Sequence, residues 1–268
     1  MAPCFTPRTL AFLRALHRHN TREWFHARRE DYESHVRGPM LSVILRLAGD
    51  FPTFAPDLVA TPQSLFRIYR DTRFSDDKRP LKTNVAASFT SRKLPRRAGA
   101  GLYFHLDPNT DREVWIGGGT YAPESHDLIR IREHIADRHV TFRAIVESPA
   151  FRKTLGTLEG AQLTRVPRGY PADHPAAGYL RYRQLYAGKS YDVTFATSPR
   201  FYTELIRVFR VVAPLVAFLN EPLVRAFESS REDPLAPLPG SRPRRTARES
   251  GGVIEARDAR SRLQFPRP

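Results

Sequence analysis

The stretch Ser64-Leu-Phe-Arg-Ile-Tyr-Arg-Asp-Thr-Arg-Phe-Ser-Asp-Asp-Lys-Arg-Pro-Leu-Lys-Thr-Asn84 begins as an extended segment and then turns polar. A strand over its first part would place Phe66, Ile68 and Arg70 on one face and the residues between them on the other. The aromatic and β-branched side chains favour a strand over a helix. We therefore expect residues 64–71 to form an extended segment of a sheet.

A turn should follow this extended segment. Residues 76–80, Asp-Asp-Lys-Arg-Pro, combine residue types that favour turns. A second apolar run, residues 85–89, then has the composition of a returning strand. The charged loop between them is predicted to lie at the mouth of a hairpin, where a scaffold commonly positions functional loops.

The stretch is dense in side chains that bind anions. Arginine is the usual basic residue here, with 38 Arg and 5 Lys in the chain, yet two of the lysines fall in this loop. A compact ammonium group differs from the planar guanidinium fork, so lysine indicates a separate role. The predicted anion-binding side chains of the stretch are Arg67, Arg70, Arg73, Lys78, Lys82 and Asn84.

The acidic residues of the stretch allow more than one interpretation. Asp71 and Asp77 can orient the basic groups around a ligand, or one of them can act as a general base. A network of ion pairs without any ligand, with Arg70 on Asp77 and Lys78 on Asp71, is the structural alternative. A nuclease interpretation fits less well, because Asp76 and Lys78 fall in the expected turn and the spacing between the acids is short.

Other residues outside the stretch are candidates for the same site. Gly117, Gly118 and Gly119 follow a predicted strand, so their amides can cradle a phosphate or carboxylate, or can allow close backbone packing. His105 shares a predicted strand face with Tyr103 and is a candidate general base, or else a hydrogen-bonded interior histidine. Arg168, in a proline-rich loop, is a candidate anion ligand or salt-bridge partner.

The remaining pattern predicts an α+β fold, in which an antiparallel central sheet is flanked by N-terminal and C-terminal helices. Strands are expected at 84–90 and 101–118. A helix should begin at Thr6-Pro7, a second should be interrupted at Gly38-Pro39, and a long one through residues 201–212 should be kinked or divided by Pro214 and Pro222. Residues 1–228 are expected to form one domain and 229–268 a disordered tail rich in proline and arginine.

The composition limits the functional classes. A net charge of +15 and a pI near 10.6 favour anionic partners, either a small molecule or nucleic acid. The single cysteine, Cys4, excludes an internal disulfide and fits a reducing cytoplasm. No apolar run is long enough to predict a membrane span. No metal-ligand spacing is present, and nothing in the sequence indicates a cofactor or an oligomeric state.

The arginine-rich motif at residues 67–83 resembles the signature of the family known as domain of unknown function 2461. The resemblance continues through Trp24-Phe25, residues 117–123 and residues 167–175, and it covers roughly residues 5 to 225. The family usually has tyrosine where this chain has Leu81. The resemblance implies no particular activity.

Together these features predict binding, or turnover, of a phosphate-bearing or other anionic ligand at the Arg/Lys/Asp-rich segment. The alternative is a non-enzymatic nucleic-acid-binding protein that acts through its general basicity. Steep loss of oligonucleotide affinity with rising salt would favour the second hypothesis.

Overall fold

The four strands of the sheet lie side by side in the same order as in the sequence. A computed structural model gives the structure, which describes residues 4–73, 76–96, 98–110 and 114–232. The strands are β1 (Val85–Thr90), β2 (Gly101–Leu106), β3 (Val114–Thr120) and β4 (Leu185–Tyr191), and each pairs antiparallel with the next. This confirms the α+β class with an antiparallel central sheet.

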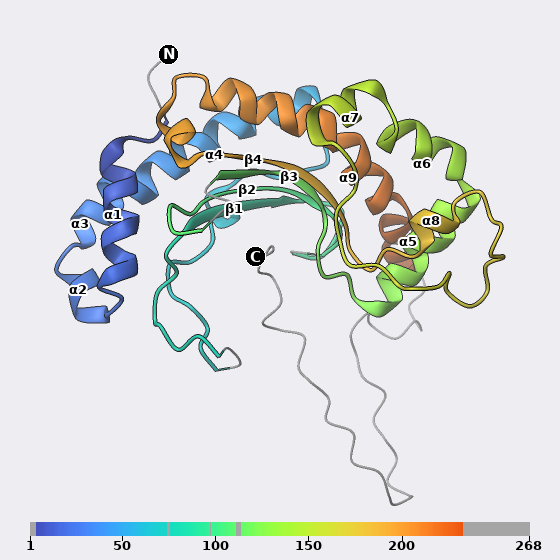
Figure 1. The fold of residues 1–268 in the computed structure, drawn as a ribbon, viewed down its shortest axis with the longest axis horizontal. Coiled ribbons are helices and arrows are strands. Elements are labelled where there is room, and N and C mark those ends of the chain that lie inside the picture. The colour runs from blue at the N-terminus through green and yellow to red at the C-terminus, as the bar shows by residue number, and fades with distance from the viewer. Residues whose placement is uncertain (1–3, 74–75, 97, 111–113, 233–268) are drawn as a thin grey trace, which may run out of the picture.

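One face of the sheet is covered by helices, and the main core lies between them (Figure 1). The long helix α9 (Phe201–Glu232) packs across this face. Alternate strand residues point toward it. The Phe89 ring lies 5.9 Å from that of Phe209 on α9 and 5.2 Å from that of Phe51, measured between centroids. Burial of these large rings is the principal driving force for docking the helices onto the sheet.

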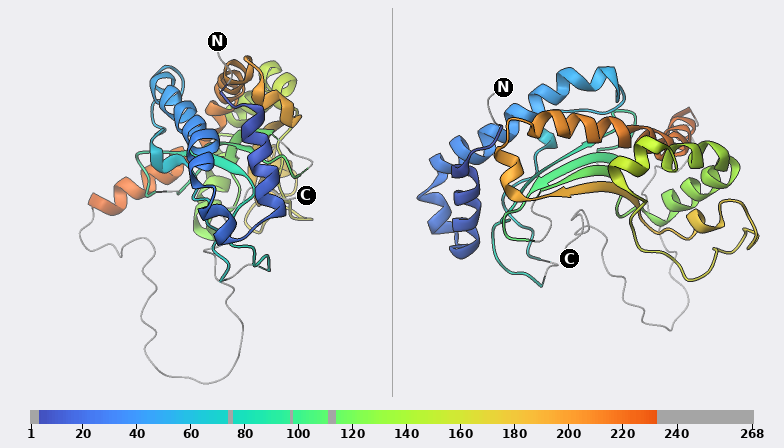
Figure 2. Two further views of the ribbon diagram at one scale, coloured as in Figure 1. Left: turned by 90° about the vertical axis from the view of Figure 1, so that its left-hand side faces the viewer. Right: turned by 45° about the horizontal axis from the view of Figure 1, so that its top comes forward.

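The N-terminal helices form one end of the molecule (Figures 1 and 2). Helix α1 (Pro7–Arg18) begins after Thr6, as expected, and α2 (Arg22–His26) begins after Thr21, whose hydroxyl accepts from the backbone N–H of Trp24 at 3.2 Å. Two elements then lead into α4 (Gly38–Asp50): α3 (Arg29–Tyr32) and the π-helix η1 (Glu33–Arg37). The 3-10 turn η2 (Phe51–Thr53) follows.

The expected interruption at Gly38-Pro39 is wrong. The chain stays helical through both residues, because the π-helical turn of η1 precedes them and α4 begins at Gly38. Proline lacks a backbone N–H, and it is tolerated in the first turn of a helix, where that group has no intrahelical partner. The chain therefore changes from a π-helical to an α-helical turn at Gly38, where the sequence had suggested that the helix is interrupted.

Four helices connect β3 to β4 and form the other end of the molecule (Figure 1). They are α5 (Ser125–Asp137), α6 (His139–Val146), α7 (Pro149–Leu155) and α8 (Ala177–Leu180). The short 3-10 helices η3 (Pro62–Ser64) and η4 (Val193–Thr197) complete the fold. This long connection keeps β4 antiparallel to β3 although many residues separate them.

Helix α9 is continuous through both of its prolines. It is not divided, and its axis bends along its length (Figure 1). The predicted apolar stripe is confirmed, since Leu205, Val208 and Val212 are fully buried. The helix extends to Glu232, so residues 229–232 are helical and do not belong to a tail. The rest of the predicted tail, 233–268, lies outside the described residues.

Candidate functional site

Residues 65–87 form an irregular hairpin, here called the charged hairpin, of which residues 74–75 are not described. Isolated bridges pair Leu65 with Ala87 and Tyr69 with Leu81. The amide of Lys82 donates to the carbonyl of Ile68 at 2.8 Å. The expected continuous strand over 64–71 is therefore not formed. The segment meets β1 at the Leu65–Ala87 bridge and through the hydrogen bond from the Phe66 N–H to the Ala86 carbonyl, and its later residues pair with residues 80–82.

The alternation expected over residues 66–70 is broken by a bend at Ile68. Phe66 packs on one side of the sheet, against Tyr103, whereas Ile68 belongs to the main core on the other side. The prediction that these two side chains share a face is therefore wrong. The bend directs the apolar residues of one short segment into two different clusters.

The far arm of the charged hairpin is anchored to the N-terminal helices. The Asn20 side chain donates to the carbonyl of Leu81 and accepts from its N–H, both at 3.0 Å, as a neighbouring strand would. Leu81 is itself fully buried. Two backbone groups are thereby satisfied without a regular sheet partner.

Asp77 holds two arginines of the charged hairpin. Its Oδ2 atom lies 3.3 Å from Nη1 of Arg70 and 2.8 Å from Nη2 of Arg79. The Arg70 side chain is only 3% exposed and that of Asp77 is 17% exposed. Hydrogen bonds from Arg79 lower the pKa of Asp77, and the nearby Arg70 charge lowers it further. The Arg70–Asp77 ion pair, which was predicted for a network without a ligand, is thus present.

Asp71 has a more open environment. It accepts from Arg73, whose Nη2 lies 2.8 Å from Oδ2, and these side chains are 39% and 76% exposed, respectively. The Arg73 hydrogen bonds lower the pKa of Asp71 to about 2. Lys78 does not pair with Asp71, because its ammonium donates to the carbonyl of Thr72 at 3.1 Å. Carboxylates with depressed pKa values are weak bases at neutral pH, so orienting the cations suits both aspartates better than proton abstraction.

A row of aromatic side chains crosses the sheet on the side opposite α9. The row, here called the aromatic belt, has three buried rings, one each on β2, β3 and β4, and a partly buried ring at each end; adjacent ring centroids lie 5.6 to 6.2 Å apart. In spatial order its members are Phe66, Tyr103, Trp115, Tyr186 and Tyr121. The charged hairpin meets the belt at one end, where the Lys82 ammonium lies 5.0 Å from the centre of the Phe66 ring.

His105 lies beside the belt, as its shared face with Tyr103 predicted. Its Nδ1 atom is 3.2 Å from the Tyr103 hydroxyl, and both side chains are buried. Burial raises the pKa of Tyr103, and the charge of Asp107 raises it further. The phenol therefore stays protonated at neutral pH and holds the imidazole by a hydrogen bond.

The turn after β2 ties the charged hairpin to the same edge of the sheet. The Asn109 amide donates to the carbonyl of Thr83 and to Asp107, both at 3.3 Å. The charge of Asp107 also contributes to the raised pKa of Arg79. Asn84, predicted as a ligand, lies immediately before β1 and is half-buried. These contacts tie the far arm of the hairpin to the end of β2, the strand that carries Tyr103 and His105.

The three glycines lie inside β3 and not in a loop after it. Gly117, Gly118 and Gly119 pair with β2 on one side and β4 on the other, so their backbone takes part in the sheet. A Cβ at Gly118 would meet Val216 of α9 at 3.2 Å. A Cβ at Gly117 would meet the Trp115 ring at 2.6 Å. The three glycines therefore allow close packing, which was the alternative to an anion cradle in the sequence analysis.

Arg168 is not brought to this region. It is exposed in the loop between α7 and α8. Figure 1 places that loop at the end of the molecule formed by α5–α8, away from the charged hairpin, and the right-hand view of Figure 2 agrees. Arg67 is exposed on the hairpin, together with Arg73 and Lys78.

The aromatic belt could not be predicted from the sequence. Trp115 and Tyr186 lie on adjacent strands that are separated by four helices along the chain. Period-two alternation relates Tyr103 to His105 within one strand, but it cannot relate residues on strands whose pairing is unknown. Among the described residues, no group of three or more His, Cys, Asp or Glu side chains could hold a metal ion.

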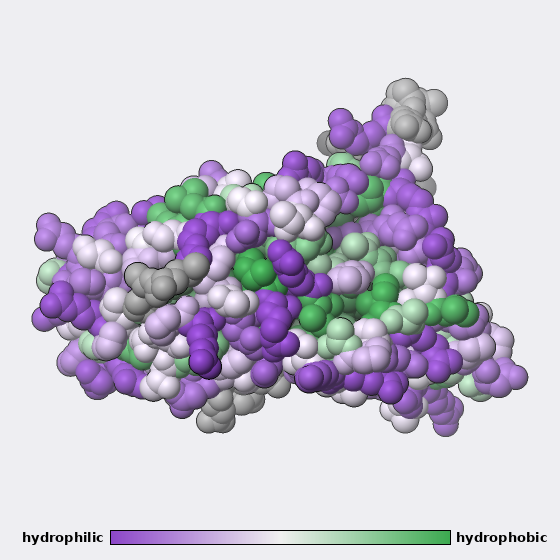
Figure 3. All heavy atoms as spheres, turned by 90° about the horizontal axis from the view of Figure 1, so that it is seen from above, coloured by the Kyte–Doolittle hydropathy of each residue, from purple (hydrophilic) through white to green (hydrophobic). Residues whose placement is uncertain are grey.

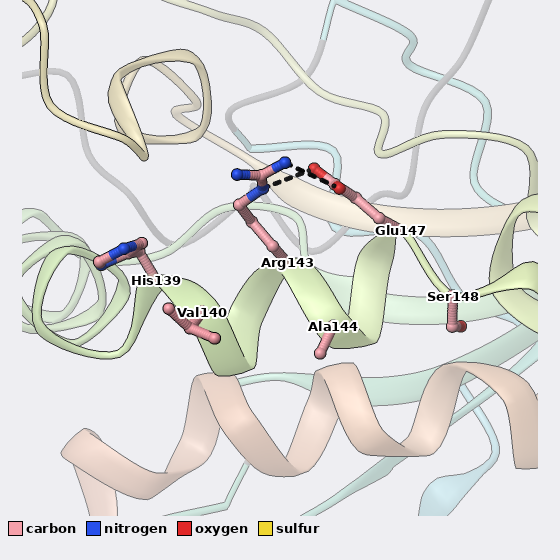
Figure 4. Close-up of a pocket in the computed structure, with 6 residues that line it drawn as sticks. All are labelled: His139, Val140, Arg143, Ala144, Glu147 and Ser148. Carbon is pink, nitrogen blue, oxygen red and sulfur yellow. Dashed lines mark hydrogen bonds and ion pairs between the residues drawn. The ribbon is translucent and has the colours of Figure 1, made fainter.

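Two surface depressions lie away from the charged hairpin, and their lining residues differ from those of the hairpin. A hollow of about 270 Å³ lies on α6, where Arg143 and Glu147 form a bidentate pair (Figure 4). The Arg143 and Tyr179 hydrogen bonds lower the pKa of Glu147 to about 2, so these groups already satisfy one another. The second depression, of about 570 Å³, is apolar, borders α9 and is lined by residues that include Phe54 and Val224. Figure 3 shows apolar side chains gathered between polar ones on this helical layer.

Comparison with known proteins identifies the family. The family model described as "Conserved hypothetical protein (DUF2461)" matches residues 8–218, so the chain belongs to this family. No curated protein and no solved structure matches the chain. In the part of the chain that the structure describes, no helix combines the length and apolarity needed to cross a membrane.

Proposed function

We propose that this member of the family binds, or turns over, a phosphate-bearing or other anionic ligand where the charged hairpin meets the aromatic belt. The observation that carries the proposal is the position of Lys82. Its ammonium lies 5.0 Å from the Phe66 ring centre, at the end of a row of five aromatic side chains. A partly buried ammonium held beside the Phe66 ring is placed to bind an anionic group.

The arrangement of the hairpin cations supports this proposal. Asp77 fixes Arg70 and Arg79 in place through its two ion pairs. Arg67, Arg73 and Lys78 are exposed on the same hairpin. Arg79, which is 40% exposed and held by Asp77, loses less side-chain entropy when an anion arrives, whereas the buried Arg70 serves to hold Asp77 in place.

His105 is the candidate for proton transfer if the ligand is turned over. It lies beside the belt, and its Nδ1 atom is 3.2 Å from the Tyr103 hydroxyl. This contact holds the imidazole ring in a fixed orientation beside the belt. A histidine held in this way is a candidate general base.

The test is a thermal-shift panel on the full chain. It would contain inorganic phosphate, sugar phosphates and nucleoside mono-, di- and triphosphates, with acetate as a monovalent control. A ligand present at 100 times its Kd stabilises the folded state by about 2.7 kcal/mol, which corresponds to a rise of roughly 5–10 °C in Tm for a protein of this size. If no phosphate compound raises Tm, the proposal is wrong.

The second candidate function is binding of single-stranded nucleic acid. The general basicity of the chain favours it, because a net charge of +15 attracts polyanions. Oligonucleotide affinity would then fall steeply with salt, and no small phosphate compound would stabilise the protein selectively. Selective stabilisation by one small compound would support the first candidate instead.

A further inference from the structure

A depression of about 350 Å³ lies at the β1 edge of the sheet, beside the site described above. Its walls are β1, the loop after β1 and the turn η3. Ser88 and Thr90 line it and alternate along β1 with residues of the main core, so they project on the same side as Ala86 of the belt cluster. Phe66 lines the depression as well and is the first ring of the aromatic belt.

The lining of this depression has the composition of an anion site. Arg92 and Arg96 line it together with five residues that carry hydroxyl groups. All eleven lining residues belong to the described part of the chain, and none of them is acidic. Hydroxyl and guanidinium donors without carboxylates match the acceptor-rich surface of a phosphate group. The hydroxyl residues are Thr61, Ser64, Ser88, Thr90 and Ser91.

The loop that carries the two arginines is held by its own contacts. Leu94, between them, is buried. The backbone N–H of Arg92 donates to the carbonyl of Asp57 at 2.9 Å, and Arg96 Nη2 donates to the carbonyl of Gln63 at 3.4 Å. The loop is thereby attached to the segment before η3 and to η3 itself, on the opposite wall.

The nearest acid is already used by a different cation. Asp57 pairs with Lys93, whose Nζ lies 3.0 Å from Oδ1. Over the described ranges, no carboxylate forms an ion pair with Arg92 or Arg96. Two guanidinium groups on one short loop without a neutralising acid repel each other, and an external anion would relieve that repulsion.

We propose that this depression is a second anion subsite, which holds a phosphate group through Arg92, Arg96 and the hydroxyls of Ser88 and Thr90. Phe66 connects it to the first site, because the same ring borders the depression and lies under the Lys82 ammonium. The full ligand class is therefore a compound with two phosphate groups, one for each site. This spanning ligand rests on the function proposed above, whereas phosphate binding by the two arginines does not.

The experiment is a calorimetric titration of the full chain with a nucleoside 3′,5′-bisphosphate, the matching 5′-monophosphate and inorganic phosphate. The double variant Arg92→Ala/Arg96→Ala should lose at least tenfold in affinity for the bisphosphate, down to the value for the monophosphate. Arg92→Lys/Arg96→Lys should keep part of the affinity, since lysine retains the charge but not the fork. Arg8→Ala/Arg14→Ala removes the same charge from exposed positions of α1 and should bind like the original chain.

The outcomes separate the two proposals. If the double alanine variant, folded by circular dichroism, binds the bisphosphate as tightly as the original chain, the second subsite is wrong. Lys82→Ala tests the first site independently. Inorganic phosphate that binds to Lys82→Ala but not to Arg92→Ala/Arg96→Ala would support the subsite even if the first site failed. Absence of binding by all three probes to the original chain would overturn both.

Discussion

The guanidinium of Arg70 is buried against the carboxylate of Asp77 inside the charged hairpin. Nη1 and Oδ2 lie 3.3 Å apart, and the arginine side chain is 3% exposed. Asp77 also binds Arg79 at 2.8 Å. One carboxylate thus fixes two cations of the candidate site, whereas Asp71 and Arg73 form a pair at the exposed surface. The two aspartates of one hairpin therefore have different roles.

Asp77→Asn should destabilise the protein by about 2 kcal/mol, because it removes the negative charge that a buried guanidinium requires. Asp71→Asn is the matched control, with the same chemical change at an exposed pair, and its Tm should stay close to that of the original chain. Urea denaturation of both variants measures the difference. Equal stability of the two variants would contradict the structural role of Asp77.

The contribution of Asp77 to stability should disappear in acid. Its pKa is lowered in the folded protein, whereas in the unfolded chain it is about 3.9. The unfolded state then binds more protons below that value, so this contribution is fully present above about pH 4 and is lost as pH falls through the folded pKa. We expect the difference in unfolding free energy between the original chain and Asp77→Asn to be constant from pH 5 to 8 and to shrink below pH 4. A difference that grows in acid would have the wrong sign.

Gly188→Ala should destabilise the protein by about 2–3 kcal/mol, since overpacking a well-filled site forces side chains and backbone to shift. A Cβ at this position would overlap the indole of Trp115 at its Cζ2 atom. Gly178→Ala is the control, because no atom lies within 4 Å of its Cβ position and it is in helix α8. Thermal denaturation of the pair tests whether Trp115 is fixed in the belt as described.

Arg73→Ala should leave the protein folded, with a Tm close to that of the original chain, since Arg73 is 76% exposed and pairs at the surface. Under the proposed function it should nevertheless weaken binding of the phosphate compound found by thermal shift. The two readouts separate a ligand contact from a structural ion pair. Loss of several degrees in Tm would indicate that Arg73 is structural.

The sequence predicted those parts of the fold that follow from local periodicity. The strands at residues 85–90 and 101–106 and the buried stripe of α9 all show a period that burial on one face requires. Proline and glycine were less informative. Gly38-Pro39 and Pro214 lie inside helices, because a π-turn or a bend accommodates the missing N–H.

The site could be predicted only where it is local in sequence. Arg70 and Asp77 belong to one hairpin, so their pairing was among the alternatives that the motif suggested. The aromatic belt depends on which strands pair and which faces they share, and Tyr186 reaches it only after the α5–α8 connection. The arginines of the β1 edge likewise meet Phe66 through the fold and not through a motif.

The central claim is that Lys82, at the junction of the charged hairpin and the aromatic belt, binds the anionic group of a ligand. The most direct test is calorimetric titration of Lys82→Ala, and of Arg8→Ala as a control with the same charge, using the phosphate compound that stabilises the original chain most. We predict at least a tenfold loss of affinity for Lys82→Ala, with a Tm without ligand close to that of the control. Unchanged affinity in a folded Lys82→Ala protein would contradict the account.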